Sequence, residues 1–328
     1  MQLTATKAKA CYTLPSEGCI LQLPRTPLVG VRLAPDEPLI HCKLEFLNPS
    51  GSTKDRVAAH ILGKAWRQGR LSKGDRVVEA SSGSTSIAMA MVAAQLGLKF
   101  TAVMPEGVSN ERSLIIRAYG GEVRTTPRSA GIGGAIEEVE RIAKEEGAFC
   151  PRQFENPDNA EAHRFGTARE IVDQVPGGTV DAFVSGVGTG GTLVGVYQGL
   201  RDEGIAAKPI AAKPVTRGEP REGGCFSTPE TCCFSSRIPG VIACTSKLYR
   251  PEVLEGLEEL EIEDERALRI ARALILEGFP VGPSSGLNFA AATDIAKRLG
   301  EGATVVTVLP DRMERYFSTE LFCETPKT

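Results

Sequence analysis

The sequence predicts an α/β protein of two doubly wound domains with mainly parallel sheets. Two observations carry this prediction. Strand-like and helix-like segments alternate in two successive series, a pattern that implies parallel strands joined by crossover helices. Loops rich in glycine or serine stand where a strand ends and a helix begins, which is the edge at which such sheets bind ligands. With 328 residues, the chain is long enough for two domains with well-buried cores.

The first series begins after an irregular N-terminal stretch. Residues 1–42 are expected to be irregular and extended, and an alternating strand at 40–45 leads into a polar loop. The elements expected after that loop are a helix at 55–68, a strand at 76–80, a helix at 84–96, a strand at 100–104, a helix at 110–119 and a strand at 122–125.

The second series begins near residue 148. Its expected elements are a helix at 160–174, a strand at 180–185, a helix at 193–202 and a strand at 210–214, then helices at 264–276 and 287–299 and a strand at 304–309. Residues 215–250 show no periodicity, and a loop of that length inside a compact protein is usually functional.

The composition is that of a globular protein and argues against two classes of partner. Apolar residues make up 41% of the chain and charged residues 24%. The net charge of −3 and the lack of a Lys/Arg cluster argue against nucleic acid. No apolar run approaches the ~20 residues needed to cross a bilayer, and the N-terminus does not follow the pattern of a signal peptide. We therefore expect a cytoplasmic protein without a membrane partner.

Cysteine and histidine give no sign of a metal site. The nine cysteines are an odd number scattered through the chain, which favours reduced thiols over a disulfide framework. The crowded group near residue 230 lacks paired Cys-x-x-Cys spacing and a neighbouring histidine; it consists of Cys225, Cys232, Cys233 and Cys244. Core or surface roles are expected for His41, His60 and His163.

Lys54 is the strongest candidate for a catalytic residue. It follows a Pro-Ser-Gly-Ser-Thr turn and precedes the helix expected at 55–68. The positive end of the helix dipole and partial burial both favour the neutral amine over the ammonium ion. A neutral lysine is a nucleophile that can form a Schiff base with an aldehyde cofactor. The alternative is an ordinary solvated lysine at a helix start.

A glycine loop at 186–192 follows the strand expected at 180–185. Its backbone amides can approach a phosphate, and the dipole of the next helix favours an anion. The same letters satisfy Gly-x-Gly-x-x-Gly, but a dinucleotide site requires an acidic residue at the end of the next strand, where this chain has Lys213. We therefore expect a single phosphate monoester here, with a simple packing turn as the alternative.

A serine loop at 81–85 has the same position between a strand and a helix. Its amides and hydroxyls can offer several hydrogen bonds to one carboxylate. A serine-rich helix cap is the alternative, and it would account for Ser84 or Thr85 alone. The loop is therefore a candidate substrate site next to the candidate lysine.

Four motifs in this order resemble those of the cysteine synthase and cystathionine β-synthase family, which are fold-type II pyridoxal-phosphate enzymes with a fold like that of tryptophan synthase β. The motifs lie at 49–56, 81–85, 188–192 and 282–286 and so span most of the chain. Segments at 25–29 and 310–319 are also similar to the family. The resemblance implies a smaller domain at 43–150 and a larger, phosphate-binding domain made of 1–42 and 151–328.

The resemblance also assigns roles to individual residues. It implies that Lys54 forms the Schiff base with pyridoxal 5'-phosphate and that Ser284 hydrogen-bonds the pyridine nitrogen. Ser84 stands where most cysteine synthases have an asparagine that contacts the cofactor's phenolic oxygen, and a subgroup that makes S-sulfocysteine looks similar here. The cofactor phosphate is assigned to Gly188, Thr189, Gly190, Gly191 and Thr192. The substrate carboxylate is assigned to Ser81, Ser82, Gly83, Thr85 and Gln153.

The implied reaction is β-replacement on O-acetylserine or O-phosphoserine through an aminoacrylate intermediate. A neutral serine at the pyridine nitrogen makes the ring a weaker electron sink than an aspartate would, which favours loss of a β-substituent over transamination. The implied enzyme is a homodimeric transferase that joins an amino-acid substrate to a small nucleophile and forms cysteine or an analogue. Synthesis of S-sulfocysteine or diaminopropionate, β-elimination from serine, threonine or cysteine, and a non-catalytic binding relative remain alternatives.

Residues 215–250 depart furthest from the family. The segment that shapes the acyl-donor pocket in the family reads Arg-Ile-Pro-Gly-Val-Ile-Ala-Cys at 237–244 in this chain. This departure leaves the leaving group open. Arg237 can hold a phosphate leaving group through bidentate contacts or can simply be solvated, whereas Arg217 and Arg221 are expected to be solvated.

Overall fold

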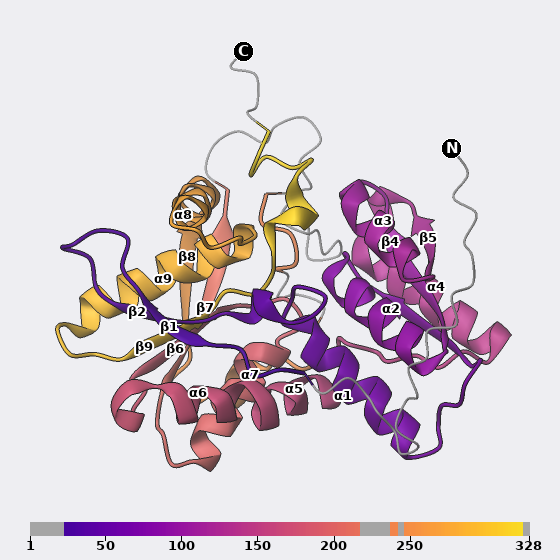
Figure 1. Cartoon of the computed structure of the whole chain (residues 1–328), viewed down its shortest axis with the longest axis horizontal. Helices are drawn as coiled ribbons and strands as arrows, with labels where there is room; N and C mark the ends of the chain where they lie inside the picture. The colour runs from indigo at the N-terminus through magenta and orange to yellow at the C-terminus, as the bar shows by residue number, and fades with distance from the viewer. Residues whose placement is uncertain (1–22, 217–236, 242–245, 324–328) are drawn as a thin grey trace.

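The computed structural model describes residues 23–216, 237–241 and 246–323. Their strands form two separate sheets, and helices cover the faces of both (Figure 1). The prediction of an α/β fold with mainly parallel sheets is therefore confirmed. The predicted domain boundaries stay a prediction.

The larger sheet has six strands in the order β1-β2-β9-β6-β7-β8. Only the pair at the β1 edge is antiparallel, and every other pair is parallel. Because β2 lies beside β9, residues 41–43 lie next to residues 306–308. The strands are β1 (Leu28–Val31), β2 (Ile40–Lys43), β9 (Val305–Val308), β6 (Ala182–Gly186), β7 (Lys208–Val215) and β8 (Glu258–Glu263).

Helices pack on both faces of the larger sheet. Alternation along β6 shows this, because Ala182 and Val184 belong to one apolar cluster while Phe183 belongs to the other. The first face packs against α8 (Asp264–Leu276) and α9 (Pro283–Leu299). The second face packs against α5 (Asp158–Ala162), α6 (Ala168–Gln174) and α7 (Gly191–Asp202), and a π-helical turn (His163–Thr167) joins α5 to α6.

The smaller sheet is fully parallel and also has two covered faces. It consists of β3 (Arg76–Ala80), β4 (Lys99–Pro105) and β5 (Glu122–Thr126). Val77 packs among residues of α1 (Lys54–Arg67), α2 (Ser84–Leu96) and α3 (Asn110–Ala118). Val78 packs among residues of α4 (Gly131–Glu146) on the opposite face.

Most predicted elements are present, and several boundaries differ for physical reasons. Helix α1 begins at Lys54 itself, one residue earlier than predicted. Helix α9 begins at Pro283 rather than at residue 287, because proline suits the first turn of a helix, where its missing N–H has no intrahelical partner. The prediction did not include α4, or the short strands β1 and β8. Three glycines near the start of α4 obscured its helical spacing.

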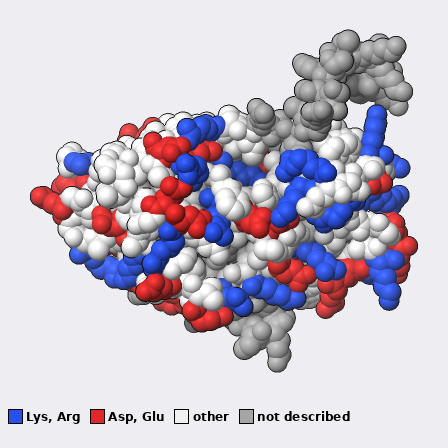
Figure 2. Space-filling model, turned by 90° about the horizontal axis from the view of Figure 1, so that it is seen from below, with Lys and Arg blue, Asp and Glu red and all other residues white. Residues whose placement is uncertain are grey.

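The surface carries mixed charge on the face drawn in Figure 2, where Lys/Arg and Asp/Glu side chains are interspersed. Within the described ranges, no helix combines the length and the apolar character that a membrane span requires. The four crowded cysteines, together with Arg217 and Arg221, lie outside the described residues.

Candidate active site

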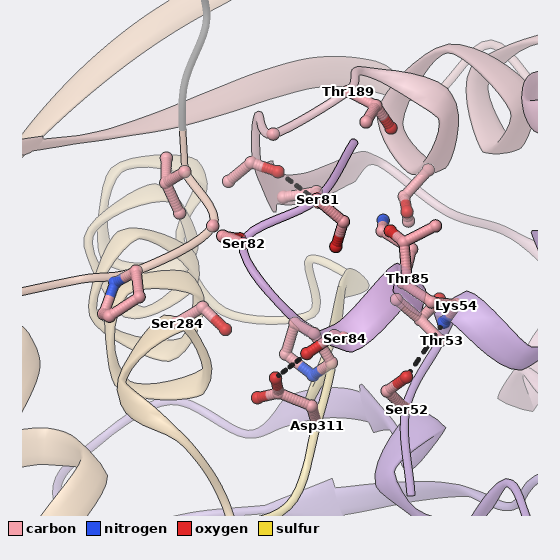
Figure 3. Close-up of a pocket in the computed structure, with 18 of the residues that line it drawn as sticks. Ser52, Thr53, Lys54, Ser81, Ser82, Ser84, Thr85, Thr189, Ser284 and Asp311 are labelled. Atoms are coloured by element: carbon pink, nitrogen blue, oxygen red, sulfur yellow. Dashed lines mark hydrogen bonds between the residues drawn. The ribbon is translucent and has the colours of Figure 1, made fainter. Parts of the chain in front are cut away.

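A pocket of about 900 Å³, counting its open mouth, lies where the carboxyl ends of β3, β6 and β9 meet the loop after β2 (Figure 3). This is the edge at which parallel sheets bind ligands. It brings together residues as far apart along the chain as Ser52 and Tyr316. The pocket is lined by Ser52, Thr53, Lys54, Ser81, Ser82, Ser84, Thr85, Arg112, Gln153, Phe154, Ser185, Gly186, Gly188, Thr189, Gly190, Thr192, Pro239, Gly240, Val241, Ser284, Asn288, Val308, Pro310, Asp311 and Tyr316.

All four motifs identified in the sequence contribute to this one pocket. Lys54, Ser284 and Gln153 line it, as do Ser81, Ser82, Ser84 and Thr85 of the serine loop and Gly188, Thr189, Gly190 and Thr192 of the glycine loop. Two of the predicted site residues do not line it. The α-carbon of Gly83 instead lies against Arg112, and that of Gly191 lies against Asn159.

The loop that carries Lys54 is fixed to the C-terminal segment of the chain. Ser52 forms an antiparallel bridge with Asp311, and the Thr53 amide donates to the Pro310 carbonyl at 2.8 Å. The Arg312 amide donates back to Gly51 at 3.1 Å. These bonds place the lysine at the first position of α1, half-buried in the pocket wall.

Burial lowers the pKa of Lys54 to about 8, and the negative charge of Asp311 opposes that shift. A sizeable fraction of the amine is therefore neutral near pH 8, whereas an unperturbed lysine would remain protonated. A neutral amine in a pocket can attack an aldehyde or accept a proton. The lysine thus has the chemistry predicted from its place at a helix start.

A buried charge network fixes the helix turn next to Lys54. The Arg56 guanidinium donates to Glu45 at 2.6 and 2.8 Å and to Glu170 at 2.8 and 2.9 Å. Glu170 also pairs with the buried Lys43 at 2.7 Å. Burial alone would raise the pKa of Glu45, but Arg56 outweighs it and lowers the pKa to about 2. The network ties α1 to the end of β2 and to α6.

The glycine loop leaves the N-terminal amides of α7 available to a ligand. The helix begins at Gly191 and has no side-chain cap, so its first amides lack intrahelical partners. The backbone of Gly240 passes close by, and a Cβ at position 188 would lie 2.3 Å from its carbonyl oxygen. Only glycine fits there. The site therefore has the amides and the dipole that a phosphate requires.

Side chains outside the motif hold the glycine loop in place. Asn159 donates to the Thr189 hydroxyl at 2.8 Å, and His163 lies 3.3 Å from the Thr192 hydroxyl. Burial, followed by the charge of Lys54, lowers the pKa of His163 to about 3, so the ring is neutral at physiological pH. His163 has the core role expected from the sequence, yet it directly supports the glycine loop.

The serine loop is joined to Gln153 behind it. Thr85 donates to the Gln153 side-chain oxygen at 2.6 Å, and the Gln153 amide nitrogen donates to Ala80 at 2.6 Å. The Ser81 hydroxyl accepts from Gly83 at 2.8 Å and from Ser86 at 3.3 Å, so it organises the loop from inside. This arrangement resembles the helix-cap alternative, although at Ser81 rather than at Ser84 or Thr85.

Several pocket residues had no role in the sequence interpretation, among them Asp311, Arg112 and Tyr316. Asp311 accepts hydrogen bonds from Ser84 at 3.0 Å and from Tyr316 at 2.7 Å. Arg112 donates to the Ser82 carbonyl at 3.0 Å and stacks 4.9 Å from the Tyr316 ring centroid. Asp311 follows an apolar strand at its carboxyl end, which is a signal that could have identified it. Arg112 offers no comparable signal.

Arg237 is engaged with protein carboxylates. Its guanidinium donates to both carboxylate oxygens of Glu320 at 2.6 and 2.8 Å and lies 2.9 Å from Glu265. Of the two alternatives for Arg237, phosphate binding and simple solvation, neither describes this arrangement, because the bidentate donor pair is already used. The leaving group therefore stays open.

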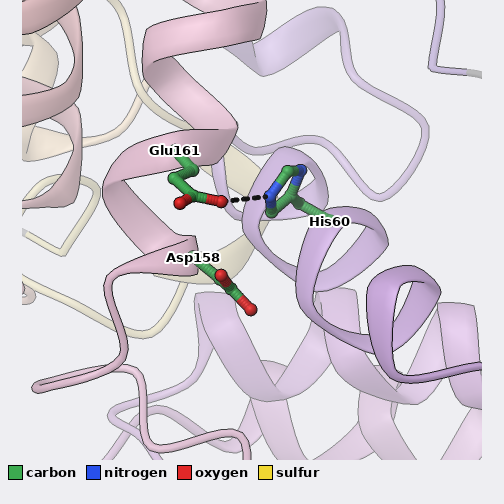
Figure 4. Close-up of side chains that lie close together, drawn as sticks. All are labelled: His60, Asp158 and Glu161. Carbon is green, nitrogen blue, oxygen red and sulfur yellow. Dashed lines mark hydrogen bonds and ion pairs between the residues drawn. The ribbon is translucent and has the colours of Figure 1, made fainter. Parts of the chain in front are cut away.

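A group of side chains outside the pocket has ligand types that suit a metal ion. His60, Asp158 and Glu161 lie close together on α1 and α5 (Figure 4). However, Lys64 pairs with both carboxylates and lies 3.0 Å from Glu161. A lysine ammonium therefore already supplies positive charge to this group, which joins the two helices.

The pocket suits a cofactor that combines an aldehyde with a phosphate. Lys54 is a lysine of lowered pKa in the pocket wall, and the uncapped start of α7 lines the same pocket. Ser284 supplies a hydroxyl at the start of α9. Pyridoxal phosphate carries an aldehyde, a phosphate and a ring nitrogen, so each of these groups has a partner of the right chemistry here.

Comparison with known proteins gives the same result. Residues 21–311 match the family described as "Pyridoxal-phosphate dependent enzyme". The chain is 39% identical to the cysteine synthase of Staphylococcus aureus strain Mu50 over 305 residues, covering 90% of this chain and 94% of that enzyme.

Two solved structures are similar along most of their length. O-ureido-L-serine synthase superposes with a TM-score of 0.80 at 36% identity, covering 93% of this chain and 94% of that one. O-acetylserine dependent cystathionine β-synthase from Helicobacter pylori gives 0.78 at 35% identity, covering 92% and 96%. The chain therefore belongs to the family of pyridoxal-phosphate dependent enzymes, is related to the cysteine synthases, and takes pyridoxal phosphate as its cofactor.

Proposed function

We propose that this enzyme catalyses β-replacement on an activated L-serine, O-acetylserine or O-phosphoserine, and forms L-cysteine or a cysteine analogue. The observation that carries the proposal is the convergence of Lys54, the serine loop, the glycine loop and Ser284 on one pocket. A carboxylate site beside a reactive lysine suits an amino acid whose α-carbon must lie next to the amine. The related cysteine synthase and O-acetylserine dependent enzyme support this class of substrate.

Lys54 would hold the cofactor and move the α-proton. With a pKa lowered to about 8, the amine can accept a proton from the substrate α-carbon and release it again near neutral pH. When bound, the cofactor supplies an electron sink for the charge left on that carbon. The glycine loop would bind the cofactor phosphate through backbone amides at the start of α7.

The serine loop would bind the substrate carboxylate. Ser82 and Thr85 line the pocket. Because the Thr85 hydroxyl donates its proton to Gln153, the Thr85 backbone amide at the start of α2 would donate to the carboxylate. Fixing the carboxylate there orients the bond to be broken and keeps the substrate at the lysine. Ser284 would face the ring nitrogen as a neutral hydroxyl, which favours loss of the β-substituent over transamination.

The nucleophile, the homodimer and the division into two domains are proposals carried by the resemblance to the family. S-sulfocysteine and diaminopropionate synthesis, β-elimination and a silent binding role share the same pocket and compete with cysteine formation. Binding of a phosphate leaving group by Arg237 has lost support, because Glu320 and Glu265 occupy its guanidinium.

A substrate panel tests the proposal. The purified, cofactor-loaded enzyme is incubated with O-acetylserine, O-phosphoserine or serine, each with sulfide, thiosulfate or an amine, and the products are identified by mass. We expect a β-substituted alanine from at least one acylated or phosphorylated donor. Pyruvate and ammonia in every arm would instead indicate elimination, and no consumption of any donor would indicate a binding protein.

A further inference from the structure

Asp311 is a buried carboxylate in the pocket to which the resemblance to the family assigns no role. It is 5% exposed and lines the pocket together with Lys54 and Ser84. Its Oδ2 accepts from the Ser84 hydroxyl at 3.0 Å (Figure 3) and from the Tyr316 hydroxyl at 2.7 Å. Its Oδ1 is buried and has no hydrogen-bond partner among the residues that the structure describes. A carboxylate held in this way has unused capacity for a positive charge.

The backbone holds this carboxylate at the meeting point of the catalytic segments. Asp311 bridges to Ser52 in the lysine loop, and its carbonyl accepts from the Gly282 amide at 2.9 Å. A Cβ at position 282 would lie 2.5 Å from Oδ1, so glycine there leaves room for the carboxylate. The side chain therefore has little freedom to turn away from the pocket.

Among the described residues that line the pocket with Lys54, Asp311 is the one carboxylate. On α1 itself, Asp55 accepts from Ser50 at 2.6 Å and Arg56 is held by two glutamates. His163 from the π-helical turn is buried and neutral. Among the described residues, neither Lys54 nor Asp311 has a direct ion pair. The two opposite charges therefore face the same pocket without neutralising each other.

The Ser84 hydroxyl is committed to this carboxylate. A carboxylate only accepts hydrogen bonds, so Ser84 must donate its single proton to Asp311. Ser84 can then offer only acceptor lone pairs to the pocket, whereas the asparagine of most relatives has an N–H₂ to donate. The departure at position 84 and the carboxylate at position 311 therefore form one unit.

We propose that Asp311, aimed by Ser84 and Tyr316, is a positioning residue that controls the proton on Lys54. It acts as a remote counter-charge that keeps the amine protonated when burial would release the proton. This inference deepens the proposed function, because it concerns the lysine assigned to the reaction. Burial lowers the pKa of Lys54, whereas the negative charge of Asp311 raises it, which is the direction that the proposal requires.

Competitive labelling of Lys54 with acetic anhydride tests the proposal without turnover. The full-length chain is freed of cofactor, labelled between pH 6 and 11, and the acetylated fraction of the Lys54 peptide is measured by mass spectrometry. We expect a midpoint near pH 8 in the wild type. Asp311→Asn keeps the acceptor for Ser84 and Tyr316 but removes the charge, so the midpoint should fall by about one unit.

Three further variants separate charge from structure. Asp311→Glu keeps the charge and should keep the midpoint within about half a unit of the wild type. Glu314→Gln removes a neighbouring carboxylate that pairs with Arg312 at 2.9 Å outside the pocket lining, and it should leave the midpoint unchanged. If the asparagine variant does not fold, Asp311→Ser removes the same charge with a smaller side chain.

The outcomes are distinguishable from those of the substrate panel. A midpoint that stays at the wild-type value in a folded, neutral variant of position 311 overturns the proposal and leaves Asp311 a structural link. A midpoint that falls in both Asp311→Asn and Asp311→Glu also overturns it, because charge would then not be the cause. A shifted midpoint without any β-replacement product retains this inference and removes the proposed function.

Discussion

Two sets of charged residues lie next to the start of α1, and they differ in whether their charges are directly paired. In the network around Arg56, each charge has a direct partner, with Glu45 and Glu170 both within 3 Å of the guanidinium. In the pocket, Lys54 is half-buried and Asp311 is buried, and neither has a direct ion pair within the part of the chain that the structure describes. Paired buried charges fix a structure, whereas incompletely paired ones retain shifted pKa values that chemistry can use. Arg56 thus belongs to a rigid network, whereas Lys54, two positions earlier in the chain, belongs to a reactive pocket.

Replacing Lys54 removes the amine from the pocket and has the largest expected effect. Lys54→Ala should abolish turnover and the visible absorbance that the amine gives with the cofactor, because no other described lysine lines the pocket. The absorbance spectrum and the product assay measure both. Lys64→Ala, on the same helix but outside the pocket, is the matched control and should retain both signals. Activity in the Lys54 variant would show that the reactive amine has been misassigned.

Disrupting the Arg56 network should lower the free energy of unfolding rather than affect the reactive amine. Arg56→Met keeps most of the side-chain volume but leaves Glu45 and Glu170 without their main cation. We expect a loss of about 3–5 kcal/mol in the free energy of unfolding, because uncompensated buried carboxylates remain. Denaturant unfolding followed by circular dichroism measures this change.

The control for Arg56 is an exposed arginine with two carboxylate partners. Arg141 contacts Glu138 and Glu145 on the surface of α4. Arg141→Met should change the free energy of unfolding by less than about 1 kcal/mol, because solvent already screens those charges. Equal losses in the two variants would contradict the view that the Arg56 network is special through burial.

The glycine loop offers a smaller and more local test. In Gly188→Ala, the new methyl group would meet the Gly240 carbonyl at 2.3 Å, so the loop must shift. We expect at least about a tenfold weaker affinity for pyridoxal phosphate, which corresponds to about 1.4 kcal/mol. Titration of cofactor-free protein measures it. Gly133→Ala has nothing within 4 Å of the new methyl group and should bind as the wild type does.

Local sequence signals were enough to find most of the fold. Predicted and observed bounds agree to the residue for β3, α2 and α8, because their apolar spacing is undisturbed. Helix α4 was missed, although Ile132, Ala135, Val139 and Ile142 are buried at helical spacing. Strand β8 was missed because four of its six residues are glutamates, which suits an exposed sheet edge.

The candidate site also has some features with local sequence signals and others without them. Loops between strands and helices carry local signals, and the four motifs found there line one pocket. The pairing of Ser84 with Asp311 joins residues 227 positions apart, and the contact of Arg112 with Tyr316 is similarly remote. Such partners depend on how β9 and the smaller sheet meet in space. The spacing of residues within one segment does not predict which distant segments come into contact.

Glu79 extends the comparison to a buried carboxylate without a strong cation partner. It is 2% exposed and accepts from the amides of Ala80 at 2.9 Å and Gln153 at 3.1 Å. Burial raises its pKa to about 8, and the backbone hydrogen bonds offset only part of that shift. The pKa of Glu45 moves in the opposite direction because Arg56 faces it. One buried glutamate thus holds its proton and the other releases it.

The two glutamates therefore affect stability in different pH ranges. Between the unfolded pKa of about 4.5 and the folded pKa of about 8, the folded chain binds the Glu79 proton more tightly than the unfolded chain does. Stability from this group is full below pH 4.5 and is lost as the pH rises towards 8. Glu45 is ionised in the folded state over that whole range and, above about pH 5.5, in the unfolded state as well, so there it adds no slope.

Glu79→Gln should remove this pH dependence. The wild type should lose stability relative to the variant by up to about 1.4 kcal/mol for each pH unit between 5 and 8. Urea unfolding of both proteins at pH 5, 6, 7 and 8 measures the difference, and subtraction cancels the groups that the two chains share. Parallel profiles would mean that Glu79 is ionised in the folded enzyme. In that case its two amide donors, rather than its burial, would control its charge.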